Sequence, residues 1–165
     1  MYFANTMTNR VKQQTDNAML DRARHLCALN EQCESGVRQK LIVWGADADT
    51  ANSSVARLRE ENYLDDKRYA RVYCESKLMG QGWGRQKVLY QLRLKHLPKD
   101  VIDNCLASID EERYQATLFD LASRKRKEFS NLSDRDRDRK LASFLLSRGF
   151  TYGEINSVIS KIIEQ

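Results

Sequence analysis

Long apolar runs are missing from this 165-residue chain. No segment approaches the ~20 apolar residues that a membrane-spanning helix needs. The N-terminal segment MYFANTMTNRVKQQTD also lacks the apolar stretch of a signal peptide. We therefore expect a cytoplasmic protein with no membrane partner.

Cysteine is sparse and lacks the spacing of a metal site. Cys27, Cys33, Cys74 and Cys105 form no CxxC pair. Because no secretion signal points to an oxidising compartment, the sequence predicts reduced, mostly buried thiols. His25 and Cys27 would lie on different faces of one helix, which argues against a shared metal site with Cys33.

Catalytic signatures are absent as well. The chain has no GxxxxGK[ST] loop, no GxSxG turn and no HExxH pair. Asp65 and Asp66 are adjacent carboxylates, but helix capping explains them better than catalysis, because a carboxylate can accept the free N–H groups of a helix start. We expect no enzymatic activity, no cofactor and no metal ion.

What the chain does contain is a pattern of short helices. Residues 63–109 read as three helices, broken by a group of glycines and by Pro98, the only proline. Proline suits the first turn of the third helix, where its missing N–H is no loss. The spacing of Tyr69, Val72 and Tyr73 predicts that these residues form the apolar face of the first helix.

The pattern recurs three times in one register. Counted from Cys33, Gly84 and Arg137, the same offsets reach apolar residues on two successive helices. The residues at the end of the second helix are Gly45, His96 and Gly149. We therefore predict an all-α fold of three tandem three-helix repeats that form an elongated, curved helical array. The predicted parts are a flexible N-terminal tail (1–16), a first repeat whose first helix is capped by Asp16 or Asn17 (17–62), and two further repeats (63–110 and 111–165).

The net charge of +5 is unevenly distributed. Residues 66–96 carry +6 and residues 117–149 carry +4, whereas residues 17–61 carry −1. A basic stripe along stacked helices suits a phosphate backbone or an acidic protein groove. The alternative is an ordinary solvated surface. The candidate residues of this basic face are Arg68, Arg71, Lys77, Arg85, Lys87, Arg93, Lys95, Arg124, Lys125, Arg126, Arg148, Arg38 and Lys40.

Aromatic residues lie beside these cations in the sequence. Trp83, which stands between two glycines, and Tyr90 are candidates for stacking on a base or on a partner side chain. Tyr73 is better explained as a core residue, because it falls on the apolar face of its helix.

Two segments carry a family resemblance. YLDDKRYA (63–70) followed by GWGRQKVLYQL (82–92) strongly resembles the RecX family, bacterial modulators of the RecA recombinase. RKLASFLLSRGFTYGEINSVI (139–159) is similar to the C-terminal repeat of that family. His96 stands where the family usually has glycine. Cys33 replaces a usual serine, so the cap at that helix start is expected to be weaker or to come from Ser35.

The resemblance implies a regulatory protein that binds RecA and its filament on single-stranded DNA, in the filament groove or at its ends. It also implies inhibition or modulation of RecA recombinase, ATPase and coprotease activity in DNA repair and the SOS response. Contact with DNA phosphates is part of this expectation, and we expect a monomer. Two alternatives stay open: a helix-turn-helix transcription regulator, and a helical-repeat adaptor for another acidic partner.

The register makes a direct prediction about Leu92, which falls at an inward position. Leu92→Ala is expected to lower the free energy of unfolding by about 2–5 kcal/mol, because a truncated core side chain leaves a cavity. Chemical denaturation of the wild-type and variant proteins measures this difference. A negligible loss would place Leu92 at the surface and contradict the register.

Overall fold

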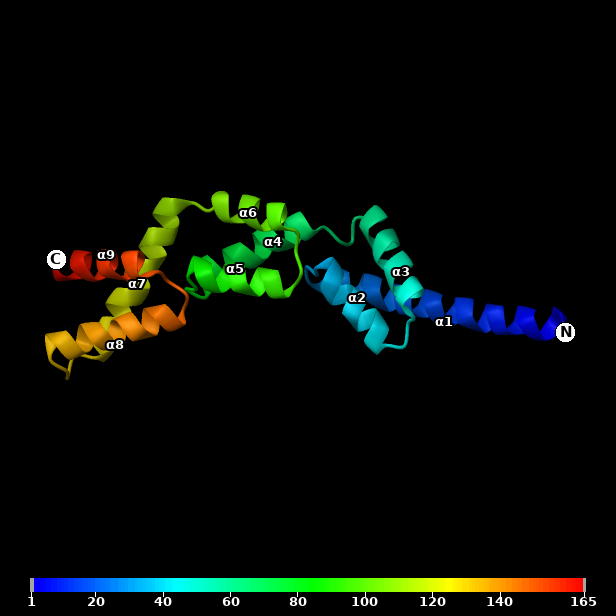
Figure 1. Ribbon diagram of the computed structural model, residues 1–165, viewed down its shortest axis with the longest axis horizontal. Coiled ribbons are helices and arrows are strands. Elements are labelled where there is room, and N and C mark those ends of the chain that lie inside the picture. Colours follow the sequence, from blue (N-terminus) through cyan, green and yellow to red (C-terminus); the bar gives the residue numbers. More distant parts are fainter. Residues whose placement is uncertain (1, 165) are drawn as a thin grey trace. The chain divides into compact units, whose positions relative to one another are not determined.

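The computed structural model describes residues 2–164, with side chains from residue 12 onward. Its helices are α1 Tyr2–Leu29, α2 Glu34–Val43, α3 Ala48–Glu60, α4 Asp66–Glu75, α5 Arg85–Leu94, α6 Lys99–Ala107, α7 Glu111–Glu128, α8 Asp134–Ser147 and α9 Tyr152–Ile163, with a π-helical turn, η1 Ser76–Gly80, after α4 (Figure 1). No strand occurs within residues 2–164, and no helix there is long and apolar enough to cross a membrane. The predicted all-α fold of three-helix repeats is confirmed.

The chain divides into two compact units, Met1–Tyr69 and Ala70–Gln165. The boundaries predicted for the tail and the repeats stay predictions, as does the elongated, curved shape. The helix α1 begins at Tyr2, whereas the sequence predicted a helix start at Asp16 or Asn17. No glycine or proline precedes Asn17, so the sequence of this segment contains no residue that breaks a helix.

The first unit packs α1, α2 and α3 around one core. Its fully buried members include Ala23, Val37, Leu41, Ala51 and Leu58. At the start of α2, the Cys33 side chain makes no capping hydrogen bond. Instead, Asp66 Oδ1 accepts a hydrogen bond from the Glu34 backbone N–H at 2.9 Å. A carboxylate of α4 therefore caps the start of α2, a long-range contact that sequence reasoning missed; the capping role of Ser35 stays a prediction.

The predicted helix ends share one backbone conformation. Gly45, His96 and Gly149 have φ values of 105°, 55° and 89°, in the left-handed region that lets the chain leave a helix. Glycine adopts this region without a steric penalty, whereas another residue is strained there by about 1 kcal/mol. The predicted helix end therefore recurs in the backbone at all three positions, and His96 adopts it at some cost.

The buried face of α4 differs from the prediction. Val72 was expected to point inward, but its side chain is 47% exposed. The buried stripe instead follows Ala70, Cys74 and Leu78, which are spaced four residues apart along the helix and its π-helical extension. Tyr73 is only partly buried, because this stripe turns it toward the edge of the packed face.

Repeats 2 and 3 meet through backbone atoms in the second unit. The Gly84 N–H donates to the Arg148 carbonyl at 2.8 Å, and the Gln86 N–H donates to the Gly149 carbonyl at 3.2 Å. A Cβ on Gly84 would lie 2.1 Å from the Gly149 oxygen. In Figure 1 the orange turn between α8 and α9 accordingly lies beside the start of α5. Only glycine permits this approach.

Side chains complete the same junction. Tyr114 of α7 is 1% exposed, and its hydroxyl accepts the Arg85 backbone N–H at 3.3 Å. Its ring packs against Phe150, with the ring centroids 6.0 Å apart. Burial raises the pKa of Tyr114, as expected for a phenol taken out of water.

Gly149→Ala tests this contact, with Gly45→Ala as a matched control. Both glycines have positive φ, but a Cβ on Gly149 would lie 2.4 Å from Lys87 Cβ, whereas nothing lies within 4 Å of one on Gly45. The free energy of unfolding should fall by about 1–2 kcal/mol in both variants, because alanine is strained at positive φ. In Gly149→Ala it should fall by a further ~1–3 kcal/mol, because the added methyl group overpacks the junction. Urea denaturation measures both, and equal losses would contradict the tight junction.

Candidate functional site

A group of cations and aromatic rings lies on the second repeat. This repeat-2 cluster comprises Tyr73, Lys77, Trp83, Lys87 and Lys95. Lys77 Nζ lies 5.5 Å from the Tyr73 ring centroid and 4.9 Å from that of Trp83. Lys87 Nζ lies 4.5 Å from the Trp83 ring, and Lys95 Nζ lies 5.8 Å from the Tyr73 ring. Cation–π attraction thus holds three ammonium groups beside two partly buried rings.

A second group lies on the third repeat. This repeat-3 cluster comprises Lys125, Phe129, Lys140, Phe144 and Arg148. Lys125 Nζ lies 5.3 Å from the Phe129 ring and 5.0 Å from the Phe144 ring. Lys140 Nζ lies 5.8 Å from Phe129, and the Arg148 guanidinium carbon lies 5.1 Å from Phe144. Again one lysine lies between two rings, and a further cation lies against each ring.

The two clusters use equivalent positions of the repeat. Lys140 and Arg148 follow Lys87 and Lys95 by 53 residues each, the same spacing that relates the apolar positions of the two repeats. The central lysine also comes from the end of the first helix in both repeats, in η1 and in α7. An ordinary solvated surface gives no reason for this recurrence.

Gln81 connects the clusters across the junction. Lys77 Nζ donates to Gln81 Oε1 at 3.1 Å, and Arg148 Nη1 donates to the Gln81 backbone carbonyl at 2.9 Å. Lys87 Nζ also reaches the Ser147 carbonyl at 3.4 Å. The two clusters therefore form one continuous patch, which we call the cation–aromatic surface.

The chemistry of the cation–aromatic surface suits anions more than bare bases. Ammonium and guanidinium groups donate hydrogen bonds to phosphate or carboxylate oxygens. Lys77 and Lys87 lie over the Trp83 ring. A base could therefore stack on this ring only after one of the two lysine side chains moves away. The stacking roles of Trp83 and Tyr90 stay predictions; Tyr90 is 59% exposed and belongs to neither cluster.

Arg85 has a structural position. Its guanidinium carbon lies 4.1 Å from the Tyr114 ring, and its nitrogens pair with Glu111 and, at 3.6 Å, with Glu154. The hydrogen bond from Arg85 lowers the pKa of Glu111. With 28% of its side chain exposed, Arg85 holds α5 to α7 and α9 and has little donor capacity left for a ligand.

Two further candidates are also engaged within the protein. In the first unit, Arg68 Nε donates to Glu31 at 2.6 Å, and its Nη2 reaches the Tyr63 carbonyl at 3.3 Å. In the second unit, Arg126 Nε donates to Asp138 at 2.9 Å, and 18% of the Arg126 side chain is exposed. Because their donors are engaged within the protein, these two arginines have less capacity left for a partner.

The remaining candidates are exposed. Arg38 Nε donates to Asn52 at 2.7 Å, and Arg124 Nε donates to the Asp120 carbonyl at 3.3 Å. The exposed candidates outside both clusters are Arg38, Lys40, Arg71, Arg93 and Arg124. Their role in binding stays a prediction.

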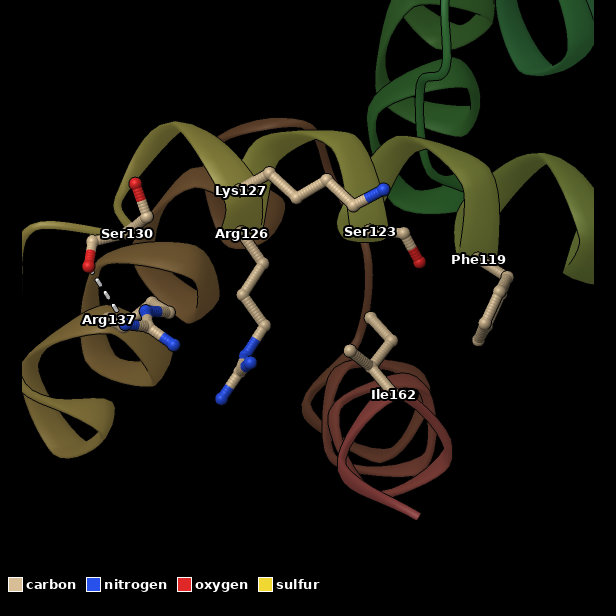
Figure 2. Close-up of a pocket in the computed structure, with 7 residues that line it drawn as sticks. All are labelled: Phe119, Ser123, Arg126, Lys127, Ser130, Arg137 and Ile162. Carbon is tan, nitrogen blue, oxygen red and sulfur yellow. Dashed lines mark hydrogen bonds between the residues drawn. The ribbon is translucent and has the colours of Figure 1, made fainter. Parts of the chain in front are cut away.

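A pocket of about 410 Å³ lies between α7, α8 and α9 (Figure 2). Figure 2 shows Arg126 pointing into it, near Ile162 of α9 and Arg137 of α8. Arg137 Nη2 donates to the Ser130 carbonyl at 3.1 Å. Arg137 also donates to the Phe129 carbonyl and so caps the end of α7. Because this wall of the pocket serves to end a helix, the pocket is a weaker candidate site than the cation–aromatic surface.

Sequence reasoning missed three members of the repeat-3 cluster, namely Phe129, Lys140 and Phe144. The repeat register could have found Lys140, since it matches Lys87. The rings had no such signal, because phenylalanine at a helix end reads as ordinary core. Within the described part of the chain, no group of His, Cys, Asp and Glu side chains could hold a metal ion.

Comparison with known proteins assigns the chain to a structural class. Residues 65–106 and 111–159 match models described as the second and third three-helix domains of RecX, so the class is a helical-repeat protein built from such domains. The crystal structure of RecX from Lactobacillus salivarius matches with a TM-score of 0.81 at 18% identity, over 93% of this chain and 99% of that chain.

Relatives at higher identity identify the family. A regulatory protein RecX of Clostridium botulinum (strain Eklund 17B / Type B) is 37% identical over 136 residues, which cover 81% of this chain and 63% of the relative. One from Clostridium perfringens (strain SM101 / Type A) is 34% identical over 134 residues, 78% of this chain and 61% of the relative. The chain belongs to the RecX family of regulatory proteins. It spans less than two thirds of the length of these relatives.

The contrast between Arg85 and Lys87 is testable by neutral substitution. Arg85→Gln should lower the free energy of unfolding by about 1–3 kcal/mol, because it removes charged hydrogen bonds from the junction. Lys87→Gln should cost about 1 kcal/mol or less, since it removes one cation–π contact and one long hydrogen bond to the Ser147 carbonyl and breaks no ion pair. Thermal and urea denaturation measure both. A larger loss for Lys87→Gln would reverse the two assignments.

Proposed function

We propose that this protein binds RecA filaments on single-stranded DNA and lowers RecA recombinase, ATPase and coprotease activity in DNA repair and the SOS response. The observation that carries the proposal is the cation–aromatic surface, which recurs at equivalent positions of two adjacent repeats. Membership of a family of regulatory proteins supports a regulatory role.

A filament suits such a surface because it is periodic. Phosphates and acidic side chains recur along a nucleoprotein filament, so two equivalent clusters can contact successive equivalent sites. Neutralising phosphates releases counterions, and binding through them weakens as salt rises. A protein that binds one assembly state of RecA more tightly than another shifts the population toward that state.

The test is single-stranded-DNA-dependent ATP hydrolysis by the RecA of the same organism, titrated with this protein. The wild type should suppress hydrolysis. The double variant Lys87→Glu and Lys95→Glu should need about tenfold or more protein to suppress hydrolysis to the same extent, equivalent to about 1.4 kcal/mol of binding free energy. Circular dichroism checks that the variant remains helical.

Lys67→Glu combined with Lys161→Glu is the matched control. Both lysines are exposed and lie outside the two clusters, and the change in net charge is the same. The control should inhibit like the wild type. If both double variants fail equally, net charge and not the cation–aromatic surface is responsible.

The stoichiometry and the partner separate the remaining possibilities. Suppression far below one copy per RecA would favour action at filament ends, and suppression near equal amounts would favour coating of the groove. If the wild type has no effect at any ratio, the proposal is wrong. Sequence-specific duplex binding in its place would support the helix-turn-helix transcription regulator.

A further inference from the structure

Two cysteines lie together in the core of the second repeat. Cys74 of α4 is 4% exposed and Cys105 of α6 is 8% exposed. Their Sγ atoms are 2.7 Å apart, and Cys105 Sγ also lies 3.3 Å from the Ala70 carbonyl. Ala70 belongs to the buried stripe of α4, so Cys105 meets α4 on its buried face.

The position of the pair suits a covalent bond. A disulfide has an S–S length of about 2.05 Å, and the two sulfurs already lie in direct contact at 2.7 Å. The other buried cysteine, Cys33, has a different neighbour, because its Sγ lies 3.5 Å from Ser35 Oγ.

We propose that Cys74 and Cys105 form an oxidation site, where a hydroperoxide converts the two thiols into an intramolecular disulfide. With hydrogen peroxide, the thiolate of one cysteine attacks the O–O bond and becomes a sulfenic acid as hydroxide leaves. The thiol of the other cysteine then attacks the sulfenic sulfur, the S–S bond forms and water leaves. The two sulfurs together lose two electrons and two protons, and the peroxide is reduced to two molecules of water.

The environment distinguishes the two thiols. Cys105 Sγ donates to Cys74 Sγ, and the contact with Cys105 together with burial raises the pKa of the Cys74 thiol. Cys105 is also the more exposed of the two. The reaction needs no fixed order, because the thiolate of either cysteine is a nucleophile and the thiol of the other can then attack the sulfenic sulfur.

The bond would tie α4 to α6 directly beneath the repeat-2 cluster. Cys74 follows Tyr73 and precedes Lys77 by less than one helical turn. Oxidation would therefore fix the segment that presents two members of this cluster, and closing the loop between the two cysteines would make repeat 2 harder to unfold.

Thiol counting on the full chain tests the proposal. Reduced protein is treated with hydrogen peroxide, denatured, alkylated and weighed intact. Untreated protein should take up four alkyl groups, one for each cysteine, and treated protein should take up two. Digestion should then release a Cys74–Cys105 linked peptide that dithiothreitol separates, while Cys27 and Cys33 are recovered alkylated as internal controls.

Variants give a second, independent measurement. Peroxide should raise the melting temperature of the wild type and of Cys27→Ser, but not that of Cys105→Ser. Uptake of four alkyl groups after peroxide, or a linkage that includes Cys27 or Cys33, would overturn the proposal. If Cys105→Ser does not fold, the peptide map of the wild type still decides.

Discussion

The second unit depends on one backbone contact, the approach of Gly84 to the turn at Gly149. The start of α5 has free N–H groups and the end of α8 has free C=O groups, and here each set satisfies the other. The positive end of one helix dipole also faces the negative end of the other. Because the contact leaves no room for a Cβ, two glycines in different repeats set how repeat 3 packs on repeat 2.

The cation–aromatic surface follows from that contact. Arg148 stands immediately before Gly149, so the turn that receives α5 also brings the Arg148 guanidinium to the Gln81 carbonyl. Lys87 lies in the first turn of α5 and is therefore held near the Ser147 carbonyl. Cations from two repeats become neighbours although they repel, since aromatic rings and carbonyl oxygens offset part of the repulsion. Binding capacity and packing thus come from the same few residues.

Much of the fold was predictable from local rules. The apolar spacing gave three repeats, and the helix ends at Gly45, His96 and Gly149 have the expected left-handed backbone. The prediction for Val72 was wrong because side-chain spacing alone cannot fix the rotation of a short helix whose buried stripe includes alanine and cysteine. The cap of α2 was missed for a different reason: Asp66 is far away in sequence, and no local motif announces it. Of the candidate site, the cationic members of the repeat-2 cluster were predicted, but Arg68, Arg85 and Arg126 could not be distinguished from them, because a sequence shows charge and not its partners.

By itself, the sequence determined the helical content, the three-fold register and the concentration of positive charge, since these depend on residue type and on spacing along the chain. Only the tertiary structure decided which cations are neutralised and which are presented on rings. It also decided that Phe129 and Phe144 join the site and that Cys74 meets Cys105. The physical reason is that each of these facts is a distance between residues far apart in the chain, and such distances are fixed by packing at the glycine junction and within each repeat.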